Sequence, residues 1–127
     1  DWSSDVCSSD LVKMSEETLF SKIIKREIPA DIVYEDNKCL AFKDINPQAP
    51  VHILIIPKQP IAFLADATVD DVELLGHLML MARQIAADQG HADDFRVVIN
   101  NGADAGQTVF HLHIHLLAGR TFYWPPG

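Results

Sequence analysis

The segment from Phe110 to Leu117 alternates three histidines with large apolar residues, and this alternation constrains the fold more than any other feature of the chain. Side chains two residues apart in a β-strand point to the same face of a sheet. The spacing therefore predicts a strand with His111, His113 and His115 on one face, roughly 6–7 Å from one to the next. The opposite face would be buried by the residues between them, Leu112, Ile114 and Leu116. Buried imidazoles need hydrogen-bond partners, so this row indicates a chemical site.

Other short apolar segments predict the remaining strands of a sheet. Strand character and flanking turn formers are found at residues 32–35, 39–43, 51–56 and 95–99. Short strands joined by tight turns are typical of antiparallel sheets. We therefore expect an α+β fold with an antiparallel sheet of about five strands and two main helices packed against it.

Two segments have helical spacing of their apolar residues. The first follows Ser15, a suitable N-cap, and Pro29 limits it to about Arg26. The second is predicted over residues 69–89 and begins with a capping box formed by Thr68 and Asp71.

Composition narrows the class of protein. The 127 residues suffice for one domain, and the net charge of −8 argues against nucleic acid held by a broad basic surface. No apolar run approaches the length of a membrane span. With only Cys7 and Cys39, we expect no disulfide framework. We therefore expect a cytoplasmic location.

The first thirteen residues differ from the rest of the chain. They are rich in Ser and Asp and have neither periodicity nor the features of a secretory signal. We interpret residues 1–13 as a non-native, disordered extension and residues 14–127 as a single domain.

A loop of turn formers precedes the histidines and offers hydrogen-bond donors. Gly106, Gln107 and Thr108 lie just before the histidine segment, and Asn100 lies at the other end of the loop. Backbone N–H groups of glycine-containing turns bind anions. Donors suited to phosphate oxygens thus adjoin imidazoles suited to nucleophilic or acid–base chemistry. A metal site is the main alternative for the histidines alone, because neutral imidazole is a common ligand.

The segment His111–Leu117 resembles the signature of the histidine triad (HIT) family, in which three histidines alternate with apolar residues. Further segments, spread over about Thr18 to Gly127, are similar to the nucleotide-binding Hint branch of that family. They include Phe20–Ile24, Glu27–Ala30, Ala41–Phe42, Asp44–Ile45, Pro47–His52, Ile56–Lys58, Leu75–Leu78, Gly119–Arg120 and Trp124–Gly127.

The resemblance implies an enzyme that hydrolyses the P–N bond of purine nucleoside phosphoramidates to a nucleoside 5′-monophosphate, without a metal or other cofactor. His113 would be the nucleophile and form a covalent nucleotidyl-histidine, oriented by the backbone carbonyl of His111. His115 would hydrogen-bond a phosphate oxygen, and His52 would support the nucleophile from behind. Thr108 would contact the phosphoryl group and assist the leaving amine.

The resemblance also implies a nucleotide pocket. Asp44 would accept hydrogen bonds from the ribose hydroxyls, as an ionised carboxylate can. The base would contact Leu19, Phe20, Ile23, Phe42 and Ile45. The phosphate would contact Asn100, Gly106, Gln107, Thr108, His113 and His115.

The expected partners are purine nucleotides such as AMP or GMP and a second copy of the chain. The resemblance implies a two-fold homodimer whose sheets join across the interface, with Trp124 near the partner's site. Two other functions stay open: a nucleotide-binding regulatory protein with incidental turnover, and a dinucleoside polyphosphate hydrolase.

Overall fold

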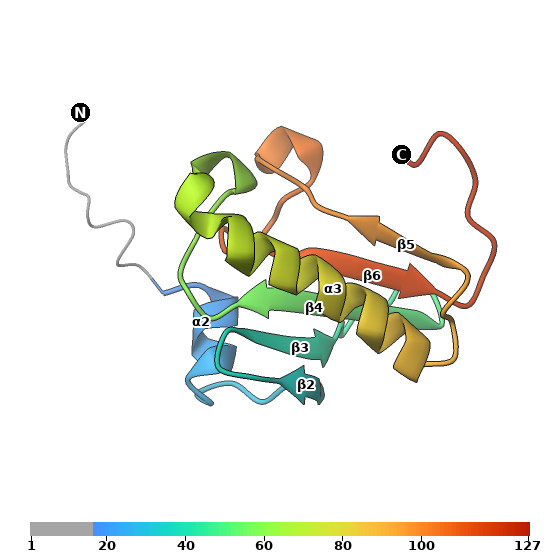
Figure 1. The fold of residues 1–127 in the computed structure, drawn as a ribbon, viewed down its shortest axis with the longest axis horizontal. Coiled ribbons are helices and arrows are strands. Elements are labelled where there is room, and N and C mark those ends of the chain that lie inside the picture. The colour runs from blue at the N-terminus through green and yellow to red at the C-terminus, as the bar shows by residue number, and fades with distance from the viewer. Residues whose placement is uncertain (1–16) are drawn as a thin grey trace.

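The computed structural model describes residues 17–127, and the interpretation of residues 1–13 and the Ser15 cap lie outside that range. The predicted α+β class is confirmed, since two α-helices pack on a five-stranded antiparallel sheet (Figure 1). The strands are β2 (Ile32–Glu35), β3 (Cys39–Lys43), β4 (Val51–Pro57), β5 (Phe95–Val98) and β6 (Ile114–Ala118). Their order in the sheet is β2-β3-β4-β6-β5, which leaves β2 and β5 at the edges.

The alternation of side chains along the strands gives the sheet two different faces. One face, here called the α3 face, buries alternate residues of β3, β4 and β6, namely Cys39, Ala41, Ile53, Ile55, Ile114 and Leu116. Leu112 joins the same cluster, as the sequence predicted. The other face, here called the α2 face, carries Leu40, Phe42, Leu54 and Ile56. By the same alternation His52 and His115 lie on the α2 face.

The long helix α3 (Val72–Asp88) covers the α3 face and contacts β4 and β6 (Figure 1). Its buried residues are Leu78, Ala82, Ile85 and Ala86. The predicted capping box is present, because the carboxylate of Asp71 accepts the Thr68 N–H at 2.9 Å. The first turn, Val69–Asp71, is a 3-10 helix, so the α-helix begins three residues later than predicted.

The short helix α2 (Leu19–Ile24) packs on the opposite face. Thr18 is its N-cap, and Ser21 donates its backbone N–H to the Thr18 hydroxyl at 3.1 Å. The helix ends before the predicted Arg26 because that residue has a left-handed φ of 65°, and Glu27 N–H returns to the carbonyl of Lys22 at 2.9 Å. Such a 6→1 bond closes a helix C-terminus.

The histidine strand is shorter than the sequence predicted. β6 begins at Ile114, so only His115 of the three histidines lies within it. The last ladder pair is Ile55↔Ile114, and continuing that register would place Leu112 opposite Pro57. Proline has no N–H to donate to a ladder, so strand pairing ends there. His111 and His113 consequently lie on an irregular segment that leads into the strand.

Among residues 17–127, no helix has the length and apolar character needed to cross a bilayer.

Candidate active site

The backbone carbonyl of His111 holds the ring of His113 in one tautomer. Its Nδ1 lies 2.7 Å from the backbone carbonyl oxygen of His111. A carbonyl oxygen only accepts, so Nδ1 carries the proton of the neutral ring and Nε2 retains its lone pair. This is the contact that the resemblance implied, and it leaves a nucleophilic nitrogen at the far end of the imidazole.

His111 is tied to the end of β4. Its Nε2 lies 2.8 Å from the carbonyl oxygen of Pro57, and its side chain is almost fully buried. The next backbone N–H, that of Leu112, donates to the carbonyl of Ile61 at 2.6 Å. The end of β4 and the connection after it thus supply acceptors for the histidine segment, and the sequence did not predict this role for Pro57.

His115, His52 and Asp44 form a second group on the α2 face. His52 Nε2 lies 3.0 Å from His115 Nδ1 and 3.4 Å from a carboxylate oxygen of Asp44. The rings of His113 and His115 are adjacent, with centroids 4.9 Å apart. The hydrogen bond of His52 therefore reaches His115, whereas the resemblance led us to expect support of His113.

Burial keeps these histidines neutral. Desolvation, together with the neighbouring imidazoles of His113 and His52, lowers the pKa of His115 to about 4. Burial also lowers the pKa of His111, His113 and His52 below that of a free histidine. Neutral imidazole is the form required of a nucleophile at neutral pH.

A cluster of aromatic and apolar residues packs beside the three histidines His111, His113 and His115. Phe20 contacts His113 edge-on with ring centroids 5.0 Å apart, and its centroid is 5.5 Å from that of Phe42. Of the residues expected around a base, Phe20, Ile23 and Phe42 share one buried cluster. Leu19 and Ile45 lie outside that cluster and are exposed, Ile45 almost completely.

In the loop before the histidines, the polar groups of Gln107 and Gly106 are engaged in hydrogen bonds within the protein. The buried Gln107 amide donates to the carbonyls of Ala62 at 2.8 Å and Val109 at 3.1 Å, and its oxygen accepts the Gly102 N–H at 2.8 Å. Its side-chain N–H groups are therefore engaged within the protein, contrary to the expectation that they would face a phosphate. The backbone N–H groups of Gly106 and Gln107 also bond within the loop.

Asn100 and Thr108 supply the remaining donors. The side chain of Asn100 lies beside Gly106, within about 3.6 Å of where a Cβ would stand there. Thr108 is exposed. Within residues 17–127, neither the Asn100 amide nor the Thr108 hydroxyl has a hydrogen-bond partner. Both are free to bind an anion.

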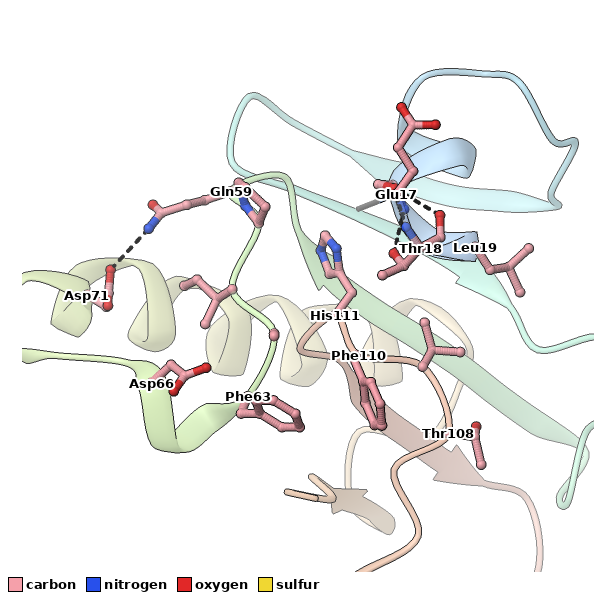
Figure 2. Close-up of a pocket in the computed structure, with 15 residues that line it drawn as sticks. Glu17, Thr18, Leu19, Gln59, Phe63, Asp66, Asp71, Thr108, Phe110 and His111 are labelled. Carbon is pink, nitrogen blue, oxygen red and sulfur yellow. Dashed lines mark hydrogen bonds between the residues drawn. The ribbon is translucent and has the colours of Figure 1, made fainter. Parts of the chain in front are cut away.

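A cavity of about 820 Å³ adjoins the triad. Figure 2 shows His111 between Gln59 and Thr18, with Phe63 and Phe110 side by side below it. Leu19, Thr108 and His111 are the expected site residues that line this cavity. The other expected residues do not line it, so the cavity lies next to the expected nucleotide pocket.

The HIT domain family matches residues 25–122 of the chain. The chain belongs to the HIT family. An uncharacterized HIT-like protein of Synechocystis is 68% identical over 114 residues, which cover 90% of this chain and all of that protein. A maize protein named "14 kDa zinc-binding protein" is 54% identical over 112 residues, covering 87% of this chain and 88% of its own length.

The fold agrees with solved HIT structures. A HIT family hydrolase from Legionella pneumophila is 48% identical, with a TM-score of 0.86 over 87% of this chain and 100% of that one. This HIT protein thus has the fold of a HIT family hydrolase, and the family match spans its three alternating histidines.

Proposed function

We propose that this HIT protein is a member of the Hint branch that hydrolyses purine nucleoside phosphoramidates to nucleoside 5′-monophosphates. The observation that carries the proposal is the state of His113, a neutral ring with Nδ1 bonded to the His111 carbonyl and a lone pair on Nε2. A nucleophile in this state attacks phosphorus without first losing a proton.

The proposed reaction has two displacements. In the first, His113 Nε2 forms a bond to the α-phosphorus while the P–N bond breaks, and the amine leaves with a proton taken from solvent through the exposed Thr108 hydroxyl. In the second, water attacks the same phosphorus and gives up a proton to solvent, the histidine–phosphorus bond breaks, and the nucleoside monophosphate departs. Two displacements at one centre divide a difficult hydrolysis into two easier steps.

Three groups support the proposed mode of nucleotide binding. The free donors of Asn100 and Thr108, together with His115, offer hydrogen bonds to the phosphoryl oxygens. One oxygen of Asp44 accepts the Asn46 N–H at 2.8 Å, which holds the carboxylate at the loop and leaves lone pairs for ribose hydroxyls. The cluster around Phe20 provides an apolar surface for either purine.

The direct test is release of AMP from adenosine 5′-phosphoramidate by the purified protein. Replacing the nucleophile by His113→Ala should lower kcat by at least about 10³-fold, since covalent catalysis is lost. Mass spectrometry of the acid-quenched reaction should detect one nucleotidyl group per chain in the native protein and none in the variant. His91→Ala, which changes a histidine outside the site, is the matched control and should turn over normally.

Other outcomes would identify the other functions. Faster cleavage of a diadenosine polyphosphate than of the phosphoramidate would indicate a dinucleoside polyphosphate hydrolase. AMP binding without turnover, and unchanged capture of a protein partner by the His113→Ala variant, would indicate a regulatory binding protein. Either result would contradict the proposed activity.

Zinc binding is the second candidate, because the maize relative carries that name and because Asp44, His52 and His115 place ligand atoms within 4.8 Å of one another. The donor set fits a metal poorly. The Gln48 N–H donates to His52 Nδ1 at 3.0 Å, whereas a neutral ring that binds metal through Nε2 must carry its proton on Nδ1. Metal analysis of the purified protein, with a zinc titration, tests this candidate.

A second cluster of ligand types, Asp36, Cys39 and His77, is also better explained without a metal. His77 Nε2 lies 2.7 Å from Asp36, which connects α3 to the turn between β2 and β3. Burial raises the pKa of the Cys39 thiol to about 12, and metal binding requires the thiolate.

We also propose that the protein is a homodimer, and we place it in the cytoplasm on the sequence argument given above. The edge strand β5 is open to pairing with a second copy, and α3 exposes the apolar residues Val72, Met79 and Leu80. Trp124 in the C-terminal segment is 83% exposed, which suits contact with a partner. Light scattering after size-exclusion chromatography should give twice the chain mass; a monomer at micromolar concentration would contradict this.

A further inference from the structure

A chain of hydrogen bonds runs from the backbone of the 44–50 loop to the triad. The Gln48 N–H lies 3.0 Å from His52 Nδ1, and His52 Nε2 lies 3.0 Å from His115 Nδ1. His52 is buried, with 7% of its surface exposed, so these contacts are shielded from water. Burial also lowers its pKa, so the ring is neutral.

The direction of each bond follows from its first member. A backbone N–H can only donate, so His52 Nδ1 must accept and cannot carry the proton of a neutral ring. That proton is therefore on Nε2, which donates to His115 Nδ1. His115 in turn must carry its own proton on Nε2, at the end of the ring away from His52.

The result is two neighbouring imidazoles with opposite properties. The His111 carbonyl leaves His113 with a bare Nε2, whereas the His52 side chain leaves His115 with a protonated Nε2. A bare nitrogen suits attack on phosphorus, and an N–H suits a bond to a phosphoryl oxygen. His115 can thus donate while neutral, which matters because burial and the adjacent imidazoles lower its pKa to about 4.

The loop residue at which this series of hydrogen bonds begins, Gln48, is held by residues that follow β6. Arg120 donates from Nε to the Gln48 carbonyl at 3.0 Å, and its guanidinium stacks on Phe122 at 4.3 Å from the ring centroid. Asp44 is the one competing acceptor near His52 in the described chain, at 3.4 Å. A ribose bound to Asp44 would compete for that carboxylate and leave the His52 N–H to His115.

We propose that His52 is a positioning residue that holds His115 as the Nε2–H tautomer, in a hydrogen-bond chain that begins at the Gln48 N–H. Its use in catalysis rests on the proposed function, but the tautomer itself does not.

Histidine tautomers in the substrate-free protein provide the first test. In protein labelled with ¹⁵N-histidine, two-bond ¹H–¹⁵N correlations at neutral pH distinguish the protonated from the bare ring nitrogen. His52 and His115 should be protonated at Nε2, and His113 at Nδ1. A His115 ring protonated at Nδ1 would overturn the proposal. This measurement needs neither substrate nor turnover, so its failure is distinct from failure of the proposed activity.

Variants of His52 provide the second test. His52→Leu removes the donor and should give His115 as a mixture of tautomers, whereas the side-chain amide of His52→Gln can donate from a position close to Nε2 and should restore the Nε2–H form. A single Nε2–H tautomer in the Leu variant would overturn the proposal. His77→Leu, a histidine bonded to Asp36 away from the site, should leave the His115 tautomer unchanged.

Kinetics separate positioning from a general loss of structure. His52→Leu should lower kcat on the order of 10- to 100-fold with little change in KM, as expected for a misoriented donor, and His52→Gln should recover most of the loss. Equal loss in the Leu and Gln variants would show that the hydrogen bond of His52 is not what matters. If the Leu variant does not fold, the Gln variant and the native spectrum still decide the matter.

Discussion

The ring of Phe20 meets the imidazole of His113 edge-on, with an interplanar angle of 84° and centroids 5.0 Å apart. Phe20 also contacts Phe42 and belongs to the apolar cluster of the α2 face. One side chain therefore borders both the proposed nucleophile and the proposed base pocket. Helix α2, although short, is the element that presents it to both.

This shared contact predicts that a change at Phe20 affects chemistry as well as stability. Phe20→Ala should lower the free energy of unfolding by about 3–5 kcal/mol, the usual cost for a buried phenylalanine. Phe20→Leu keeps most of the volume and should cost about 1.5 kcal/mol or less, yet still lower kcat/KM because the edge contact with His113 is lost. Denaturant unfolding and AMP release measure the two effects. Unchanged kcat/KM in the Leu variant would contradict the role in the site.

The loop before the triad predicts opposite behaviour for two adjacent residues. Gln107→Ala removes three hydrogen bonds from a buried position and should lower the free energy of unfolding by roughly 2–4 kcal/mol. Thr108→Ala changes an exposed side chain and should alter stability by about 0.5 kcal/mol or less, while kcat falls. Thr108→Ser retains the hydroxyl and is the control, so it should keep most of the activity. Thermal unfolding and steady-state kinetics decide; full activity in Thr108→Ala would remove Thr108 from the mechanism.

The lowered pKa values of the four histidines predict two effects of acid. In the unfolded chain histidines bind protons near pH 6.5. In the folded protein they do so at lower pH, down to about 4 for His115. Between pH 6.5 and about 4 the unfolded state therefore binds more protons, so the free energy of unfolding falls as the pH falls through this window. His115→Asn should make that decrease shallower.

The same shifts determine where activity declines. The proposed nucleophile works as a neutral ring, and burial lowers the pKa of His113. The acid limb of kcat/KM should therefore have its midpoint below pH 6.5. A midpoint above 6.5 would show that His113 gains a proton more readily in the folded enzyme, contrary to its burial.

Gly119 predicts a specific loss of stability at the far end of β6. Its φ of 97° is unfavourable for other residues, and a Cβ there would stand 2.9 Å from Cβ of Pro50. Gly119→Ala should therefore lower the free energy of unfolding by on the order of 1–3 kcal/mol. Because Pro50 ends the loop that holds Gln48, kcat should fall as well. Gly90→Ala, at a left-handed glycine with open space around it, is the matched control for strain without the clash.

The periodic parts of the chain could be predicted from sequence, because burial imposes their spacing. The continuous apolar runs of β3 and β4 correspond to strands that are buried on both faces, and the spacing of Leu78, Ala82 and Ile85 corresponds to the buried face of α3. The strand ends of the histidine segment could not be predicted in this way. Alternation favours a strand from His111 onward, but Pro57 on the neighbouring strand stops the ladder, and that constraint depends on which strands pair.

Within the candidate site, which side chains lie close together was easier to predict than which hydrogen bonds they form. Gln107 has the chemistry of a phosphate ligand, but burial among the carbonyls of Ala62 and Val109 uses its donors. The bond of His52 to His115 depends on the register of β4 against β6, where His52 lies opposite Leu117 and Leu54 opposite His115. Neither relationship is visible in the order of the residues alone.

The backbone carbonyls of Pro57, Ile61 and Ala62 accept hydrogen bonds from the histidine segment and from Gln107, and these bonds limit the changes in length that the chain tolerates. Residues 58–63 have the appearance of a surface connection, where insertions and deletions are usually accepted. At the end of β4, the Pro57 carbonyl binds His111. Within the connection, the carbonyls of Ile61 and Ala62 bind Leu112 and Gln107. A one-residue change in the length of this connection would shift those acceptors relative to the three histidines. The hydrogen bonds of the candidate active site therefore constrain the length of a segment that itself lies outside that site.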